Sequence, residues 1–274
     1  PTLITVIFGT VVDSIDQIAD YDGDYDFVVP SFLKLPARIT RPVIELLRRP
    51  IGDRDDTVVC TERTDGDVHP LRVRTHDLHE RQLTTTGRTW AMIDQVHGTD
   101  RVDHDVRESS SDEPVIGVGD VLVAAAGQPI AIWAADCAAF VLIGDDGALV
   151  GCHAGWRGLA AGVIDVAIAA RPAGGGPRCA VLGPCIHPCC YEFGLAELER
   201  VAAAIDVEPA LIAATATSGA PALDVPTAVA LALGNHGIEL DVVGPCTSCD
   251  ERWFSHRRGD VGRHAVVAWS EPAP

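Results

Sequence analysis

The sequence predicts an α/β fold of the α+β type, a mixed β-sheet sandwich with flanking helices in one main domain. Short apolar runs bounded by Gly, Asp or Pro recur from Trp90 onward, which is the pattern of buried strands. Several runs follow one another with no helix between them, so the chain lacks the strict alternation of strand and helix that gives a doubly wound parallel sheet. With 274 residues, of which 47% are hydrophobic, the chain can bury a large core.

The predicted elements follow in order along this part of the chain. Three segments have the pattern of helices, residues 159–170, 195–205 and 227–233. The first of them ends before Arg-Pro-Ala-Gly-Gly-Gly-Pro, whose prolines and glycines stop a helix. The predicted strands are residues 118–124, 130–134, 140–143, 149–152, 179–182, 240–243 and 265–269.

Residues 1–60 differ from the rest of the chain. Residues 3–12 predict a strand, but the stretch that follows, Asp-Gln-Ile-Ala-Asp-Tyr-Asp-Gly-Asp-Tyr-Asp, is acidic, rich in turn residues and without a sustained period. We therefore expect residues 1–60 to form an N-terminal appendage and residues 61–274 to form the main domain.

The charge of the chain limits its partners. The formal net charge is -18, whereas a nucleic-acid groove or a surface that binds anionic membranes needs clustered cations, so neither partner is expected. Lys34 is the only lysine, so an anionic substrate would be bound by arginine, whose planar fork matches phosphate and carboxylate. The sequence gives no indication of an oligomeric state.

The sequence favours a cytoplasmic location. No apolar run reaches the roughly 18 residues of a membrane span, and no basic region precedes the apolar stretch at the N-terminus. Nine cysteines, some in close pairs such as Cys189-Cys190 and Cys246-Thr-Ser-Cys249, fit a reducing compartment better than a secreted disulfide scaffold.

Two imidazoles and a thiol mark the candidate site. His97, Cys137 and His153 each stand where a predicted apolar strand meets a loop rich in Gly and small residues, so they can converge at one sheet edge. Their wide spacing is unlike the paired ligands of structural zinc modules, but catalytic zinc sites take three ligands from separated segments. Thiolate and imidazole ligands favour zinc or copper over magnesium. A metal site and a Cys-His catalytic centre are both compatible with this trio.

The surrounding motifs resemble one protein family. They are Gln-Val-His-Gly at 95–98, Ala-Asp-Cys at 135–137, His-Ala-Gly-Trp-Arg-Gly at 153–158, Gly-Pro-Cys-Ile at 183–186, Tyr-Glu-Phe-Gly at 191–194, and Cys246 followed by Phe-Ser-His-Arg at 254–257 and Gly-Arg at 262–263. In order and spacing, roughly residues 62–270 are similar to the YfiH family, which was long labelled as laccase-domain polyphenol oxidases and is described as purine nucleoside phosphorylases.

The resemblance implies a catalytic role for residues 61–274. It implies that His97, Cys137 and His153 bind a metal, usually zinc, with copper as the alternative, and carry the catalysis. It also implies phosphorolysis of adenosine, inosine and methylthioadenosine by phosphate, together with adenosine deamination. Phosphate and a nucleoside are then the expected small-molecule partners.

Substrate contacts are expected from residues close to the trio. Phosphate requires cationic forks in so acidic a protein, which points to Arg157, Arg257 and Arg263, while Arg258 is expected to be a solvated neighbour. Gln95 can bond substrate or close a turn. In the same region, Trp156 is expected to pack against the loop. Asp136 is a candidate either for orienting an imidazole or for shaping a turn, and Asp120 is a candidate either for a turn or capping role or for catalysis.

Other interpretations remain open. In a Cys-His hydrolase, His97 or His153 would lower the pKa of Cys137 so that the thiolate attacks an acyl centre, and some YfiH proteins are described as editing factors for peptidoglycan precursors. A copper-dependent polyphenol oxidase is disfavoured because no run of closely spaced histidines is present. A partner-dependent regulator has only the acidic N-terminal stretch in its favour. A second metal site or a redox pair is a further possibility for Cys185, Cys189, Cys190, Cys246 and Cys249.

Overall fold

The computed structural model describes residues 6–7, 10–11, 44–51, 54–104, 113–170 and 177–270. Residues cluster into two units, Pro1–Pro42 and Val43–Pro274. In the first unit, β1 (Val6–Ile7) and β2 (Thr10–Val11) pair antiparallel, where the sequence predicted one strand over residues 3–12. The acidic stretch that follows lies outside the described residues.

A four-stranded sheet begins before the predicted main domain. Its order is β3-β4-β16-β9, formed by β3 (Ile44–Ile51), β4 (Arg54–Cys60), β16 (His264–Ser270) and β9 (Ile130–Ala134). All three pairings are antiparallel. The boundary predicted at residue 60 therefore does not coincide with the division between the two units, because β4 is an inner strand of this sheet.

A six-stranded sheet forms the other half of the sandwich. Its strands are β15 (Leu240–Val242), β12 (Pro177–Leu182), β10 (Ala138–Gly144), β11 (Leu149–Ala154), β8 (Val121–Ala124) and β6 (Arg101–His104), in that order. The outer pairs β12–β15 and β6–β8 are parallel, and the inner pairs are antiparallel. The sheet is therefore mixed, and the predicted fold class is confirmed.

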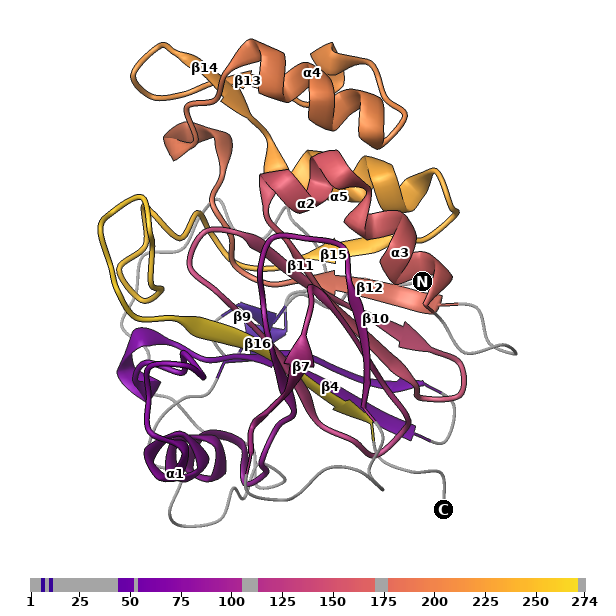
Figure 1. Ribbon diagram of the computed structural model, residues 1–274, viewed down its shortest axis with the longest axis vertical. Coiled ribbons are helices and arrows are strands. Elements are labelled where there is room, and N and C mark those ends of the chain that lie inside the picture. Colours follow the sequence, from indigo (N-terminus) through magenta and orange to yellow (C-terminus); the bar gives the residue numbers. More distant parts are fainter. Residues whose placement is uncertain are drawn as a thin grey trace. The chain divides into compact units, whose positions relative to one another are not determined.

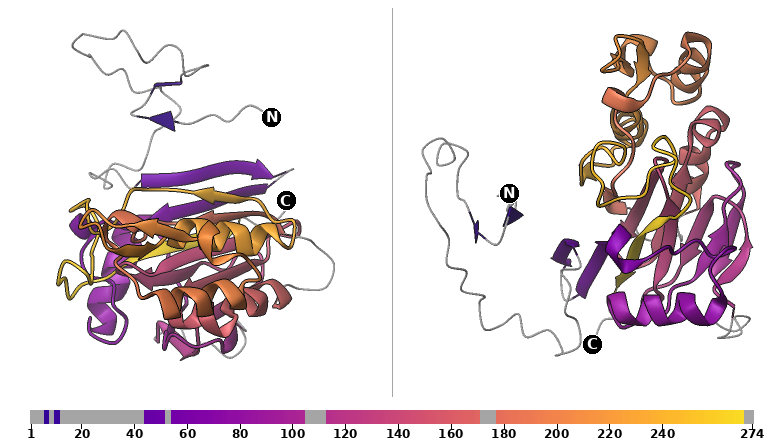
Figure 2. Two further views of the ribbon diagram at one scale, coloured as in Figure 1. Left: turned by 90° about the horizontal axis from the view of Figure 1, so that it is seen from above. Right: turned by 90° about the vertical axis from the view of Figure 1, so that its left-hand side faces the viewer.

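Alternation along the strands separates the core into layers. In β10, Phe140 and Leu142 face the helices, whereas Val141 and Ile143 face the four-stranded sheet. In β9, Ile132 belongs to the layer between the sheets. The helices on the outer face of the six-stranded sheet are α2 (Trp156–Ala161), α3 (Val163–Ala169) and α5 (Val225–Gly234). The fourth helix of this side, α4 (Leu195–Ala204), packs against α2 farther from the sheet, as Figures 1 and 2 show.

One helix covers the opposite side of the sandwich. α1 (Thr75–Thr86) buries Leu78 against Trp90 and the outer face of the four-stranded sheet (Figure 1). The sequence did not predict α1, because its composition is mostly polar and only Leu78, Gln82 and Thr85 are buried. No helix within the described ranges is long and apolar enough to span a bilayer.

Two predicted segments are interrupted. The predicted helix over 159–170 consists of α2 and α3, which are separated at Gly162 because its φ of 86° ends the first helix. The predicted strand over 118–124 begins only at Val121, and the residue before it, Asp120, lies in a bend. Val118 instead ends β7 (Val115–Val118), which pairs parallel with β5 (Met92–Asp94). The sequence did not predict the short strands β5, β6, β13 (Ala213–Thr215) and β14 (Pro221–Leu223).

Candidate metal centre and active site

The structure brings the three predicted residues together. Cys137 immediately precedes β10, and His153 lies in β11, which pairs with β10 so that His153 stands opposite Ala139. His97 lies in the loop after β5 with a φ of 61°. One ligand atom from each of the three side chains lies within 4.8 Å of the others, and His97 Nε2 is 3.7 Å from Cys137 Sγ. The predicted convergence at one sheet edge is therefore present.

A buried carboxylate orients one imidazole. His153 Nδ1 lies 2.8 Å from Asp120 Oδ1, and both side chains are almost fully buried. Because the carboxylate accepts the Nδ1 proton, Nε2 is the nitrogen of His153 that remains for the trio. The sequence suggested this orienting role for Asp136, whereas the structure gives it to Asp120.

The same carboxylate shapes the loop that carries His97. The backbone N–H groups of Val96, His97 and Gly98 donate to Asp120 at 3.3, 3.0 and 2.7 Å. These bonds fold the loop around the carboxylate and hold His97 in the left-handed region, which is uncommon for a residue other than glycine. Asp120 thus places two of the three trio residues at once.

Asp136 anchors a different loop. Its carboxylate accepts hydrogen bonds from Thr247 Oγ1 at 2.7 Å, Ser255 Oγ at 3.1 Å and the backbone N–H of Arg257 at 2.6 Å. Its own φ is 91°, so it forms a sharp turn directly before Cys137. Asp136 therefore shapes a turn, and it ties the segment around Arg257 to the trio.

Aromatic rings and two guanidiniums lie next to the trio, since Trp156 and Arg157 directly follow Gly155, at whose position a Cβ would face His97 and Cys137. We call the side chains of Trp156, Arg157, Tyr191, Phe193 and Arg257 the wall. Trp156 meets Phe193 edge to face with centroids 5.6 Å apart, and Phe193 lies 5.2 Å from Tyr191. The guanidinium of Arg157 lies 4.7 Å from the Trp156 centroid, and that of Arg257 lies 5.4 Å from the Tyr191 centroid. Trp156 packs as the sequence predicted, and both arginines are exposed. Tyr191 and Phe193 were not predicted as site residues, although both lie in the Tyr-Glu-Phe-Gly motif at 191–194.

The thiol and the buried imidazole polarise each other. Burial disfavours ionisation of Cys137, but the charge of His153 and hydrogen bonds with both imidazoles outweigh it and lower the pKa of Cys137 to about 6. Burial likewise disfavours imidazolium, but the Cys137 thiolate and Asp120 raise the pKa of His153 to about 9. A thiolate is therefore available near neutral pH, either as a metal ligand or as a nucleophile.

Comparison with known proteins identifies the family. Residues 64–271 match the model of the multi-copper polyphenol oxidoreductase laccase family. The chain belongs to this family. A purine nucleoside phosphorylase of Streptomyces coelicolor is 36% identical over 184 residues, which cover 65% of this chain and 73% of the relative. YlmD of Geobacillus stearothermophilus, also named a purine nucleoside phosphorylase, is 31% identical over 190 residues, which cover 64% and 69%.

Solved structures of similar proteins confirm the fold. A hypothetical protein YfiH of Bacillus licheniformis superposes with a TM-score of 0.64 at 22% identity, over 78% of this chain and 92% of that one. The structure of YlmD from Geobacillus stearothermophilus superposes with a TM-score of 0.64 at 22% identity, over 84% of this chain and 100% of that one. The resemblance to YfiH proteins drawn from the motifs is confirmed.

The trio of this laccase-family protein has the donor set and spacing of an open zinc site. For a tetrahedral zinc with bonds of about 2.1 Å to nitrogen and 2.3 Å to sulfur, the N···S separation is ~3.6 Å. The distance from His97 Nε2 to Cys137 Sγ is 3.7 Å. Three ligands leave a fourth position for substrate or water, and the exposure of His97 puts that side in contact with solvent.

Two further predicted residues are engaged by the protein itself. The side-chain amide of Gln95 accepts from Trp133 N–H at 3.0 Å and donates to Trp133 C=O at 2.7 Å, which joins the end of β5 to β9. Arg263 donates to the carbonyls of Val261 and Gly262, both at 2.8 Å. The hydrogen bonds of Gln95 and Arg263 are therefore made within the protein, and neither side chain needs a substrate as a partner.

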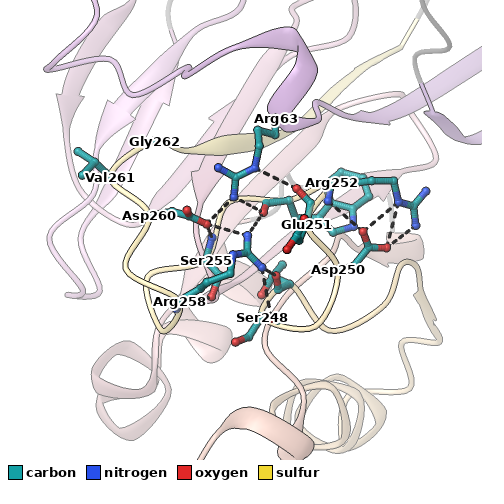
Figure 3. A network of polar contacts seen from close by, with 12 residues as sticks. Arg63, Ser248, Asp250, Glu251, Arg252, Ser255, Arg258, Asp260, Val261 and Gly262 are labelled. Carbon is teal, nitrogen blue, oxygen red and sulfur yellow. Dashed lines mark hydrogen bonds and ion pairs between the residues drawn. The ribbon is translucent and has the colours of Figure 1, made fainter.

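Arg258 is a structural residue rather than the solvated neighbour that was predicted. Its guanidinium donates to the carbonyls of Thr247 and Trp253 and forms an ion pair with Asp260 at 2.7 Å. Asp260 also binds Arg63 at 2.5 Å (Figure 3). This network holds the loop that carries Arg257.

We expect Gly155→Ala to disrupt the trio without unfolding the protein. A Cβ at this position would lie 2.6 Å from His97 Cδ2 and 3.2 Å from Cys137 Sγ, so the imidazole must move. The affinity of the trio for zinc should fall at least about tenfold, which corresponds to ~1.4 kcal/mol of binding free energy. The matched control is Gly234→Ala at the end of α5, where a Cβ meets nothing within 4 Å. Equal zinc affinity of the trio in the two variants would show that Gly155 does not limit the site.

Proposed function

We propose that this protein is a zinc-dependent purine nucleoside phosphorylase acting on adenosine, inosine or methylthioadenosine. The observation that carries the proposal is the trio of His97, Cys137 and His153 beside a wall of aromatic rings and two arginines. Within the described part of the chain, neither Arg157 nor Arg257 has a carboxylate partner. Their charge is therefore not neutralised by a protein carboxylate and can bind an anion.

The wall residues match the needs of phosphorolysis. A phosphate oxygen forms a bond to the anomeric carbon C1′ as the C1′–N9 bond breaks, and the bonding pair leaves with the purine, which takes up the proton that the attacking phosphate releases. Arg157 and Arg257 are suited to holding the phosphate, since a guanidinium binds it through parallel N–H donors. The rings of Tyr191, Phe193 and Trp156 offer flat apolar surface to a purine.

The metal would add electrophilic chemistry at the same place. Bound zinc would polarise a substrate oxygen or bring the pKa of water towards neutrality, which is also what adenosine deamination requires. Asp120 would keep His153 in the tautomer whose Nε2 faces the ion. The names of the Streptomyces and Geobacillus relatives support the phosphorolytic activity.

A substrate comparison tests the proposal. The purified chain is incubated with adenosine, with and without phosphate, and adenine, ribose 1-phosphate and inosine are measured. Equal amounts of adenine and ribose 1-phosphate, formed only when phosphate is present, are expected. Formation of inosine from adenosine in the absence of phosphate would show that the protein also deaminates adenosine. Free ribose in place of ribose 1-phosphate, or no product from any of the three nucleosides, would contradict phosphorolysis.

We expect Arg157→Ala and Arg257→Ala each to raise the KM for phosphate about 10- to 100-fold. The range corresponds to losing one hydrogen-bonded contact to a charged group, about 1.5–3 kcal/mol. Arg200→Ala, which removes an exposed arginine from α4, is the matched control and should leave this KM unchanged. A change in kcat or in the KM for nucleoside alone would assign the two arginines to another step.

A hydrolase remains the second candidate because of one observation. Cys137 Sγ lies 3.7 Å from His97 Nε2, and its pKa is lowered to about 6, as in an activated nucleophile. Cleavage of a muropeptide by metal-free protein, abolished by a thiol alkylator, would favour this function.

The description of the family also suggests a copper-dependent polyphenol oxidase. This activity is tested by loading the protein with copper and assaying it for oxidation of a polyphenol.

A further inference from the structure

Four cysteines form a second cluster apart from the trio. Cys189 and Cys190 lie in the short 3-10 helix η3 (Pro188–Cys190), and Cys246 and Cys249 lie in a turn far along the chain. One sulfur from each of the four residues lies within 4.8 Å of the others. Cys185, which the sequence grouped with them, is not part of this cluster, and its side chain is fully buried in the core beneath the helices.

The sulfur positions fit a metal better than a disulfide. Cys249 Sγ lies 3.3 Å from Cys190 Sγ and 3.6 Å from Cys189 Sγ, and all four thiols are free. A disulfide bond is about 2.0 Å long and uses only two of the four sulfurs. In a tetrahedral zinc site with Zn–S bonds of about 2.3 Å, the sulfurs are ~3.8 Å apart. The cluster therefore needs only small shifts to enclose an ion.

The backbone around the cluster supports thiolate ligands. The N–H of His187 points at Cys246 Sγ at 3.4 Å, and the turn from Cys246 to Cys249 is closed by an N–H···O bond of 3.0 Å between them. Arg258 donates to the carbonyls of Thr247 and Ser248 at 2.9 and 3.3 Å, which brings a positive charge to this turn. A hydrogen bond to sulfur and a nearby cation both offset the charge of a four-thiolate site.

The two arms of the cluster lead to the active-site wall. Cys190 is followed directly by Tyr191, and the loop after Cys249 reaches Arg257, whose guanidinium lies over the Tyr191 ring. Arg257 also donates to the carbonyl of Glu192 at 3.4 Å. An ion bound by the four thiolates would join these segments next to the wall.

We propose that Cys189, Cys190, Cys246 and Cys249 bind one structural zinc ion through four thiolates. Four protein ligands complete the tetrahedron, so the site has no open position and performs no chemistry. The ion fixes η3 and the loop after Cys249 to each other. The proposal does not depend on the metal state of the trio, because the two sites share no ligand.

Zinc stoichiometry in single-site variants tests the proposal. The full chain is purified with a non-thiol reductant, given zinc and desalted, and zinc per chain is measured. We expect two zinc ions in the unchanged protein, one in Cys137→Ala, one in Cys249→Ser and none in the double variant. Cys60→Ala, which removes a buried core thiol outside both clusters, is the matched control and should keep two.

X-ray absorption of the Cys137→Ala variant gives an answer that does not depend on how Cys249→Ser folds. The zinc left in Cys137→Ala should be surrounded by four sulfurs at about 2.3 Å. Zinc-free Cys137→Ala protein, or zinc with fewer sulfur ligands, would overturn the proposal. A mass two hydrogens lower in freshly isolated zinc-free protein would replace it with a disulfide between two of the four residues. If Cys137→Ala loses phosphorolysis but keeps this four-sulfur zinc, the four-cysteine site is supported and the loss of activity is assigned to the trio.

Discussion

Cys137→Ala is expected to remove the metal from the trio and to lower kcat/KM for phosphorolysis at least about a thousandfold, or ~4 kcal/mol of activation free energy. In the proposed zinc site, Cys137 would supply the single thiolate among three ligands, and the two remaining imidazoles could not make a three-ligand site. The measurements are nucleoside phosphorolysis at saturating phosphate and zinc content of the trio, with Cys60→Ala as a control for losing a buried thiol.

The same variant separates the two roles left open for Cys137. As a metal ligand, its loss removes both zinc and activity; as a nucleophile, its loss removes activity and leaves the metal in place. Alkylation adds an independent readout. Because the pKa of Cys137 is about 6 without metal, iodoacetamide should modify metal-free protein readily at pH 7, and the rate should fall as the pH drops below about 6. Zinc should protect the thiol, and alkylation that zinc does not slow would contradict ligation.

Asp120→Ala should have the second large effect, because it removes the acceptor of four hydrogen bonds. The backbone N–H groups of Val96, His97 and Gly98 and the Nδ1–H of His153 would all lose their partner. We expect the free energy of unfolding to fall by about 3–5 kcal/mol, as for other broken buried charge pairs. Zinc affinity of the trio should fall about 10- to 100-fold.

The pH dependence of this loss follows from the pKa of Asp120. Burial opposes ionisation, but the hydrogen bonds from His153 and from the loop hold the pKa of Asp120 below its ordinary value. Its contribution to stability is therefore present above the unfolded pKa of about 3.9 and is lost as the pH falls through the lower folded pKa. Denaturant unfolding of both proteins should show the largest difference between about pH 5 and 6.5. The difference should shrink in acid as Asp120 takes up a proton, and shrink again as the pH rises through about 9, where His153 loses the proton that Asp120 stabilises.

Asp146→Asn is the matched control for Asp120→Ala. Asp146 is an exposed carboxylate in the β10–β11 turn, and it accepts one backbone N–H, that of Ala148, at 3.0 Å. Its replacement should change the unfolding free energy by less than about 0.5 kcal/mol and leave zinc affinity unchanged. Equal zinc affinities in the Asp120 and Asp146 variants would show that the carboxylate does not position the trio.

Sequence patterns predicted most of the longer strands after residue 118 because the relevant signal is local, but they predicted neither β3 nor β4. Residues 130–134 and 140–143 are apolar throughout, and the structure buries both of their faces, one in each adjoining layer. A short run of this kind indicates a buried strand whichever neighbouring strands it pairs with. The polar helix α1 and the short strands β13 and β14 lack this signal, since most of their side chains face solvent or a small local contact.

For this protein, the sequence by itself determined the fold class, the family resemblance and the three residues of the trio. Tertiary structure alone decided that Asp120 rather than Asp136 orients His153, and that four of the five clustered cysteines meet. The physical reason is distance along the chain. Asp120 and His153 are 33 residues apart, and Cys189 and Cys249 are 60 apart, so each pairing depends on how strands and loops pack, which no local pattern specifies.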